Sequence, residues 1–292
     1  MTDSARSKVT IPQLRRWKTE GRKVAWVTAY DFPTGQFVDM AGVDMVLVGD
    51  SVGNNVLGYE NPIPVTMDEM ISHAQAVTRG CKYALVIGDM PFMSYQASKE
   101  DAIRNAGRFL KEARCDSVKL EGGRAMADTV RAIVQAGMPV MGHLGLTPQS
   151  EAMMGGLKVQ ARTADDARKL LDDALALEDA GAWAVLVEAI PARVAQIVRD
   201  RLKVPVYGIG AGPYVDGQVL IFHDMFGLFQ AYTPKFAKRY ADLGKQIVEG
   251  LRQYADEVRE GKFPDREHSF TIQTEELEKL KSSLGGSGER DV

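Results

Sequence analysis

The chain has 292 residues, of which 36 are lysine or arginine and 39 are aspartate or glutamate, so its formal net charge is −3. This near-neutral balance argues against a nucleic-acid-binding protein, which usually carries a strongly basic face. At about 150 residues per domain the length sets a soft expectation of two domains. The two cysteines, Cys81 and Cys115, lack CxxC spacing and predict neither a disulfide framework nor a zinc site.

Membrane and export signals are not found in the sequence. No stretch reaches the roughly 18 apolar residues of a membrane span, and residues 1–10 contain no apolar signal core. Few cysteines fit a reducing compartment. We therefore expect a cytoplasmic enzyme or binding protein whose partners include neither a membrane nor a nucleic acid.

The first expected element is a short helix over Ile11–Glu20. Eight short apolar runs follow, the pattern of parallel strands that are buried on both faces. They are Val24–Thr28, Met45–Val48, Ala84–Ile87, Ser117–Leu120, Pro139–Gly142, Ala184–Val187, Pro205–Ile209 and Gln218–Phe222.

Helix-like stretches separate many of these runs. Two are clear, Lys99–Arg114 and Ala164–Asp179, and Thr163 is the expected N-cap of the second. Glycine adopts the left-handed conformation that ends a helix at little cost, and we expect this of Gly42, Gly80, Gly137 and Gly181.

The repeated order of strand, helix and glycine predicts βαβ units and a (β/α)8 TIM barrel, with the Ile11–Glu20 helix capping its bottom. A doubly wound sheet is the competing fold, but no GxGxxG fingerprint follows the first strand.

The C-terminal part carries a different pattern. Apolar residues spaced three and four apart over Phe236–Val258 predict an amphipathic helix packed on the outside of the barrel. From Thr271 the sequence is polar. We expect one barrel domain over residues 1–270, with outer C-terminal helices, and a polar, disordered tail over 271–292.

Acidic residues directly follow four of the predicted strands, at the end of a barrel that carries its chemistry. They are Asp50, Asp89, Glu121 and Glu188. Each alone is an ordinary loop or N-cap residue, but crowded carboxylates repel unless a cation lies among them. Oxygen ligands without a cysteine or histidine cluster suit magnesium better than zinc. We assign Asp50, Asp89 and Glu121 to the metal, directly or through water.

Three further side chains each leave two interpretations open. Lys119 points to the same side of its strand as Glu121, either as a structural ion pair or as a cation for a substrate carboxylate or an enolate oxygen. His143 is a satisfied core histidine or a substrate ligand. Glu188, across the rim from the metal residues, is a general base or an ordinary loop glutamate.

Two glycine-containing loops also have open roles. Gly208–Gly212 follows the seventh strand, where many barrels bind phosphate, but it also fits a tight turn. The long connection 147–162 is a candidate lid.

Several segments in chain order carry a resemblance to a known family. They are Thr28–Asp31, Val48–Ser51, Pro64–Thr66, Asp89–Phe92, Val118–Gly123, Gly142–Gln149, Gly208–Gly212 and Glu267–Phe270. Taken together, the chain resembles the ketopantoate hydroxymethyltransferase family. The resemblance implies a barrel of the phosphoenolpyruvate mutase/isocitrate lyase type and a large homo-oligomer, commonly a decamer.

The same resemblance implies site roles. The family holds magnesium at the positions of Asp50, Asp89 and Glu121. It binds its 2-oxoacid at the positions of Asp50, Ser51, Asp89 and Lys119. His143 matches an active-site histidine, and Glu188 the proton acceptor.

The implied activity is hydroxymethyl transfer from 5,10-methylenetetrahydrofolate to 3-methyl-2-oxobutanoate through a magnesium-stabilised enolate, giving 2-dehydropantoate for pantothenate and coenzyme A. Two alternatives stay open. One is a lyase of the related superfamily, although those enzymes carry a cysteine-bearing loop where this chain reads Glu121-Gly-Gly-Arg-Ala. The other is a non-catalytic barrel that binds small oxoacids or serves as a scaffold.

Overall fold

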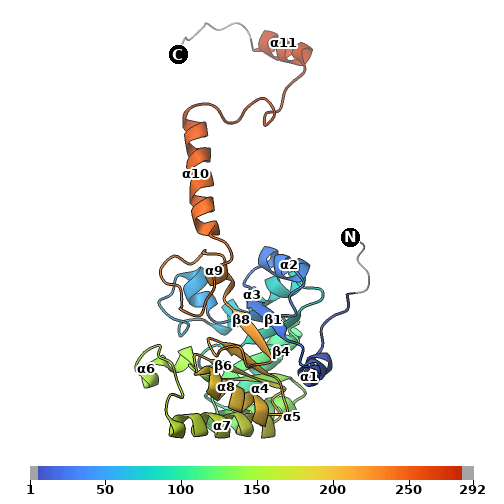
Figure 1. Ribbon diagram of the computed structural model, residues 1–292. Coiled ribbons are helices and arrows are strands. Elements are labelled where there is room, and N and C mark those ends of the chain that lie inside the picture. Colours follow the sequence, from blue (N-terminus) through green and yellow to red (C-terminus); the bar gives the residue numbers. More distant parts are fainter. Residues whose placement is uncertain (1–5, 285–292) are drawn as a thin grey trace. The chain divides into compact units, whose positions relative to one another are not determined.

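The computed structural model describes residues 6–284, and its contacts divide the chain into two compact units at Ala241–Asp242. The first unit contains eight parallel strands that pair in sequence order and close into a barrel (Figure 1). The predicted (β/α)8 fold is confirmed. The division falls earlier in the chain than the boundary that we expected after residue 270.

The barrel strands lie where the apolar runs predicted them. They are β1 (Val24–Thr28), β2 (Met45–Val48), β3 (Leu85–Asp89), β4 (Ser117–Glu121), β5 (Val140–Gly145), β6 (Ala184–Glu188), β7 (Val206–Ile209) and β8 (Gly217–Leu220). The ends differ in one systematic way. Asp89, Glu121 and Glu188 are the last residues of their strands, and His143 lies inside β5. A strand ladder can continue through a polar residue, which an apolar pattern does not detect.

Helices surround the barrel. They are α2 (Phe32–Met40), α3 (Met67–Gly80), α4 (Lys99–Lys111), α5 (Ala127–Gln135), α7 (Ala164–Asp179) and α8 (Ala192–Arg201), with short turns η1 (Gly53–Leu57), η2 (Arg124–Met126), η3 (Pro148–Ser150), α6 (Glu151–Met154) and α9 (Phe222–Met225). The α7 prediction is confirmed, and Thr163 Oγ1 accepts the Asp166 N–H at 3.1 Å as its N-cap. Residues 210–216, between β7 and β8, form no helix, so the alternation is incomplete there.

Three of the four expected helix-ending glycines are in the left-handed region: Gly42, Gly137 and Gly181. The prediction for Gly80 is wrong, because this residue is the last residue of α3. A Cβ at Gly80 would lie 2.6 Å from the carbonyl oxygen of Phe32, so the glycine serves close packing of α3 against α2.

The end of the barrel at the amino termini of the strands is filled. Helix α1 (Ile11–Glu20) buries Leu14 and Trp17 in one cluster with Trp26 and other strand residues. Tyr207 packs edge-on against Trp26 and Trp183, with ring centroids 5.5 and 6.3 Å away. Helix α1 thus packs over this end of the barrel. Among residues 6–284, a cavity opens at the other end, where the strands have their carboxyl ends.

The second unit contains α10 (Leu243–Arg259) and α11 (Thr274–Ser283). The helix predicted over Phe236–Val258 begins only at Leu243, and no residue of α10 is buried. The helix itself is confirmed over its later part, and its packing on the outside of the barrel stays a prediction, because periodicity identifies an apolar face but not what covers it. Helix α11 lies within the tail that we expected to be disordered, and residues 285–292 of that tail are outside the described residues.

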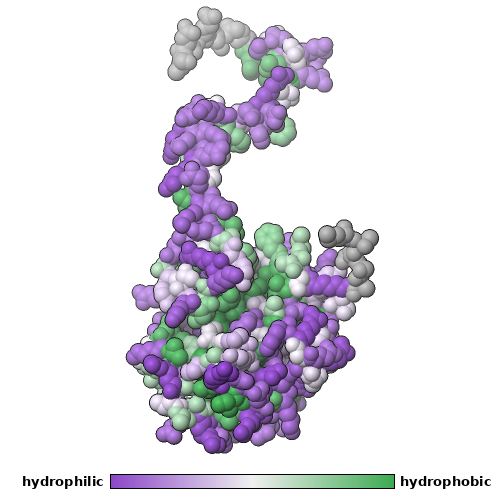
Figure 2. Space-filling view, viewed as in Figure 1, coloured by the Kyte–Doolittle hydropathy of each residue, from purple (hydrophilic) through white to green (hydrophobic). Residues whose placement is uncertain are grey.

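The barrel unit carries mostly polar side chains on the surface seen in Figure 2. Hydrophobic atoms on this face lie over α2, where Phe37 and Met40 are exposed. Both cysteines, Cys81 and Cys115, are free and buried. Among residues 6–284 no helix has the length and apolar character needed to span a bilayer.

Two glycines provide a matched test of the packing. A Cβ at Gly88 of β3 would lie 2.2 Å from the buried ring of Phe109, whereas a Cβ at Gly107 of α4 would meet only Met138 Sδ at 3.8 Å. Overpacking costs about 1–3 kcal/mol, and alanine is favoured over glycine inside a helix by about 1 kcal/mol. We expect Gly88→Ala to lower the free energy of unfolding in urea and Gly107→Ala to raise it. Equal effects would contradict this packing account.

Candidate active site

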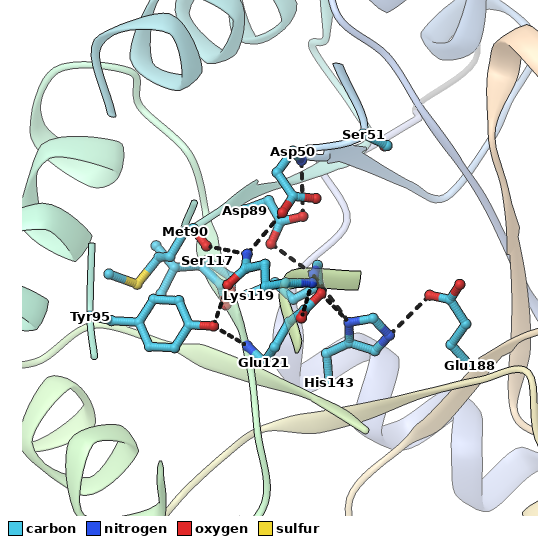
Figure 3. A network of polar contacts seen from close by, with 12 residues as sticks. Asp50, Ser51, Asp89, Met90, Tyr95, Ser117, Lys119, Glu121, His143 and Glu188 are labelled. Atoms are coloured by element: carbon cyan, nitrogen blue, oxygen red, sulfur yellow. Dashed lines mark hydrogen bonds and ion pairs between the residues drawn. The ribbon is translucent and has the colours of Figure 1, made fainter. Parts of the chain in front are cut away.

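A cavity of about 700 Å³ opens at the carboxyl ends of the barrel strands. Seven site residues predicted from the sequence line it together: Asp50, Ser51, Asp89, Lys119, Glu121, His143 and Glu188. Figure 3 shows these side chains converging from neighbouring strands. The strand order therefore brings together residues that are far apart in the sequence.

Lys119 lies at the centre of the acidic cluster. It is the register partner of Asp89 on β3, and its Nζ lies 2.7 Å from Asp89 Oδ1 and 4.0 Å from Glu121 Oε1. All three side chains are at least 97% buried. Burial lowers the pKa of Lys119, but the surrounding carboxylates outweigh burial and raise it. The structural ion pair expected as one alternative is present, and the same ammonium faces the cavity.

Asp50 and Asp89 are held against each other. The Asp50 N–H donates to Asp89 Oδ2 at 3.1 Å. Burial raises the pKa of Asp50, and the charge of Glu121 adds to this effect, while Lys119 opposes it. Burial also raises the pKa of Asp89 to about 7, against the opposing charge of Lys119. Both shifts show that the ionised forms lack sufficient positive charge nearby.

His143 lies between two carboxylates, as Figure 3 shows. Its Nδ1 is 3.2 Å from Glu121 Oε1, and its Nε2 is 3.1 Å from Glu188 Oε2. Burial and Lys119 lower the pKa of His143, but the contacts with Glu121 and Glu188 raise it to about 9. The imidazole thus connects the acidic cluster to Glu188, and its Nδ1 also lies 3.3 Å from Lys119 Nζ.

The charges of the cluster test whether a divalent cation fits. When all are ionised, the carboxylates of Asp50, Asp89, Glu121 and Glu188 face one ammonium and one imidazolium, which leaves two negative charges in excess. A doubly charged cation would balance them. Among residues 6–284 no three histidine, cysteine, aspartate or glutamate side chains form a ready-made metal cage. The observation that favours a divalent cation is the charge excess, and magnesium needs only one or two carboxylates as direct ligands because it keeps several waters.

The structure adds residues to which the sequence analysis gave no role. Tyr30 is buried and its Oη lies 2.8 Å from Ser51 Oγ. Gln149 donates hydrogen bonds to the carboxylates of Asp50 and Glu121, and the Tyr95 hydroxyl accepts one from the Glu121 backbone N–H. Tyr30 and Gln149 lie within the segments that resemble the known family, and this was the one sequence signal for a role in the site. Tyr95 lies in none of these segments, so nothing in the sequence pointed to it.

The glycine segment after β7 has a packing role. A Cβ at Gly210, which has a φ of +61°, would lie 2.6 Å from Phe236 Cδ1. The glycine therefore lets the Phe236 ring lie against the turn, in line with the tight-turn interpretation of this segment.

Solved structures share this fold. A phosphonopyruvate hydrolase in complex with oxalate and Mg²⁺ aligns with a TM-score of 0.59 at 13% identity, over 94% of this chain and 96% of that one. A 2,3-dimethylmalate lyase of the PEP mutase/isocitrate lyase superfamily aligns with a TM-score of 0.59 at 16% identity, over 97% and 99%. At these identities the likeness establishes the fold alone. The fold and the acidic cluster thus define the class: a closed (β/α)8 barrel with a polar cavity at the carboxyl ends of its strands, a fold that these solved structures share.

Sequence relatives narrow the class. The 3-methyl-2-oxobutanoate hydroxymethyltransferase of Moorella thermoacetica is 56% identical over 265 residues, covering 91% of this chain and 98% of that protein. The protein of the same name from Alkaliphilus metalliredigens is 54% identical over 275 residues, covering 94% and 97%. The family model described as ketopantoate hydroxymethyltransferase matches residues 8–266. The chain belongs to the ketopantoate hydroxymethyltransferase family, and the resemblance stated from its motifs is confirmed.

The excess of negative charge generates a test by thermal unfolding. A ligand that binds only the folded state stabilises it by about 2.7 kcal/mol at one hundred times its Kd. We expect Mg²⁺ to raise the melting temperature of the wild type in a saturable way and EDTA to reverse the rise. Asp50→Asn should lose most of the rise, whereas Asp128→Asn, which alters an exposed carboxylate on α5, should keep it. An undiminished rise in Asp50→Asn would remove Asp50 from the metal site.

Proposed function

We propose that this protein transfers a hydroxymethyl group from 5,10-methylenetetrahydrofolate to 3-methyl-2-oxobutanoate, giving 2-dehydropantoate on the route to pantothenate and coenzyme A. The observation that carries the proposal is family membership over residues 8–266 together with the buried cluster of acids, lysine and histidine in one cavity. The product requires a new bond between C3 of the oxoacid and the one-carbon unit.

Glu188 is the proposed proton acceptor. It ends β6 on the side of His143 opposite Glu121, and its side chain is only 16% exposed. Glu188 removes the C3 proton. One C–N bond of the methylene bridge breaks to give an iminium, and the electron pair of the broken C–H bond forms the new bond to the methylene carbon. Water then replaces the second folate nitrogen on that carbon as the hydroxyl group. Tetrahydrofolate leaves with one proton from water and the C3 proton returned by Glu188.

Charge placement supports the roles of the other residues. Lys119 and Ser51 hold the oxoacid carboxylate, and His143 orients the Glu188 carboxylate through the 3.1 Å contact. Asp50, Asp89 and Glu121 would hold magnesium, directly or through water. When bound, magnesium supplies a Lewis acid that draws electrons from the substrate carbonyl and so acidifies the C3 proton.

We further infer that the protein works as a cytoplasmic homo-oligomer, a decamer, as its family resemblance implies. Analytical ultracentrifugation of the full chain measures this state directly. A stable monomer would contradict the inferred assembly without affecting the proposed chemistry.

The proposed activity is tested by incubating the protein with Mg²⁺, 3-methyl-2-oxobutanoate and methylenetetrahydrofolate and measuring tetrahydrofolate release. We expect release that depends on all three components. Absence of product at every metal and folate concentration would overturn the proposal. Turnover of isocitrate or methylisocitrate with Mg²⁺ would favour the lyase alternative, and oxoacid binding without turnover would favour the non-catalytic one.

The role of Glu188 is tested separately, by exchange of the C3 hydrogen of the oxoacid in deuterium oxide without folate. Because a general base contributes about 10²–10⁴-fold to rate, Glu188→Gln should slow exchange by that factor while oxoacid binding persists. Glu100→Gln, at an exposed position on α4, serves as the control. Exchange at the wild-type rate in Glu188→Gln would exclude Glu188 as the base.

A further inference from the structure

Gln149 contacts two of the carboxylates assigned to the metal. It lies in η3 after β5 and is 5% exposed. Its Nε2 donates to Asp50 Oδ2 at 2.8 Å, and its backbone N–H donates to Glu121 Oε2 at 3.0 Å. Asp50 follows β2 and Glu121 ends β4, with β3 between them in the barrel. Gln149 therefore links two acids whose strands are not neighbours.

The surroundings fix the orientation of the Gln149 amide. Its Nε2 also donates to the Met90 carbonyl oxygen at 3.0 Å, so both amide protons point at oxygen acceptors. Its Oε1 accepts the Tyr95 hydroxyl proton at 2.6 Å. A flipped amide would place its oxygen against a carboxylate and a carbonyl, so only one orientation satisfies these partners.

Tyr95 closes a ring of hydrogen bonds that passes through Glu121 and Gln149, and Asp50 is attached to this ring through Gln149 Nε2. Tyr95 is 1% exposed, and its Oη accepts the Glu121 N–H at 3.1 Å while donating to Gln149. One path then runs from the Glu121 backbone through Tyr95 and Gln149 to Asp50. The Gln149 N–H returns to the Glu121 carboxylate. The ring fixes Asp50 and Glu121 relative to each other.

The need for such a ring follows from electrostatics. Two ionised carboxylates repel strongly where water is excluded. Gln149 donates to one oxygen of each acid and leaves Asp50 Oδ1 and Glu121 Oε1 for other partners. Groups that orient metal ligands in this way often change metal affinity 10- to 100-fold when removed.

We propose that Gln149, oriented by Tyr95, is a positioning residue that sets the separation and side-chain conformations of Asp50 and Glu121 for a divalent cation. It acts through these carboxylates and touches neither substrate nor the reacting atoms. The inference rests on the proposed function for the assignment of the two acids to a metal.

Mn²⁺ binding, followed by the loss of the electron paramagnetic resonance signal of free Mn²⁺, tests the inference without turnover. We expect Gln149→Met, which keeps the side-chain length, to weaken Mn²⁺ binding by about tenfold or more. Tyr95→Phe keeps the ring and should weaken binding in the same direction by a smaller factor. The two effects should combine less than additively, because Tyr95 acts partly through Gln149.

Turnover supplies a second readout. In Gln149→Met the Mg²⁺ concentration for half-maximal activity should rise by a similar factor, and saturating Mg²⁺ should restore a large part of kcat. A general structural defect would not be rescued in this way.

Two substitutions outside the site serve as matched controls. Tyr207→Phe removes the hydroxyl of another fully buried tyrosine, whose Oη has no hydrogen-bond partner among the described residues. Gln75→Met changes a glutamine on α3 whose side-chain amide donates to the Glu112 carbonyl at 3.3 Å, away from the acidic cluster. Both should bind Mn²⁺ within twofold of the wild type.

The experiments distinguish a failure of the inference on Gln149 from a failure of the proposed function. Wild-type Mn²⁺ affinity in folded Gln149→Met, judged by circular dichroism, would overturn the inference and leave the proposed function intact. If Gln149→Met does not fold, the same criterion applies to Tyr95→Phe. Absence of Mn²⁺ binding by the wild type would overturn both the inference and the metal assignment, whereas tetrahydrofolate release tests the reaction itself.

Discussion

A surplus of buried negative charge at the mouth of the barrel is the constraint on which the other features of the site depend. Ionised carboxylates removed from water are costly unless donors and cations surround them. Here the backbone N–H groups of Asp50 and Gln149 and the ammonium of Lys119 each meet one acidic oxygen. These contacts compensate only part of the charge, as the raised pKa of Asp89 shows. The negative charge that remains uncompensated favours the binding of a cation at this site, and a cation there would in turn attract an anionic ligand.

The barrel supports this site through close packing on its outer face. Gly88 and Gly142 directly precede Asp89 and His143, and since successive residues of a strand point to opposite faces, these glycines face the helices. A Cβ at Gly142 would lie 2.6 Å from Leu177 of α7, and Gly88 is similarly tight against Phe109 of α4. Helices that approach this closely leave little freedom to the strand residue that points inward. Close packing of the helices on the outer face thus restricts the positions of Asp89 and His143 on the inner face.

The sequence was most informative where one physical rule dominates. Strands buried on both faces must be apolar, so all eight appeared as short runs, and the N-cap of α7 was identified from Thr163 alone. The acidic residues of the mouth were also found, because parallel topology brings the strand ends together. What covers the apolar face of α10 could not be predicted, since an amphipathic pattern does not specify a partner. The helical state of Thr274–Ser283 was missed because its composition is mostly polar.

The contacts behind the site were beyond sequence reasoning for a different reason. Gln149 and Asp50 are 99 positions apart, and Tyr95 and Gln149 are 54 apart. No sequence pattern distinguishes a buried glutamine or tyrosine that positions other side chains from one that is exposed to solvent. Only the closed geometry of the barrel, which places the loop after β5 beside the end of β2, gives these side chains a shared task.

The raised pKa of Asp89 links the site to the stability of the whole protein. Its pKa is about 7 in the folded state against 3.8 when unperturbed, so the folded protein binds the proton more tightly than the unfolded chain does. This contribution to stability is complete at a pH below 3.8 and is lost as the pH rises through 7. At a pH well above 7, where Asp89 is ionised, this residue no longer contributes to stability, and its buried charge adds to the repulsion among the carboxylates. A cation bound at these carboxylates would favour their ionised forms, so the charge excess that costs stability without the cation would increase stability with it.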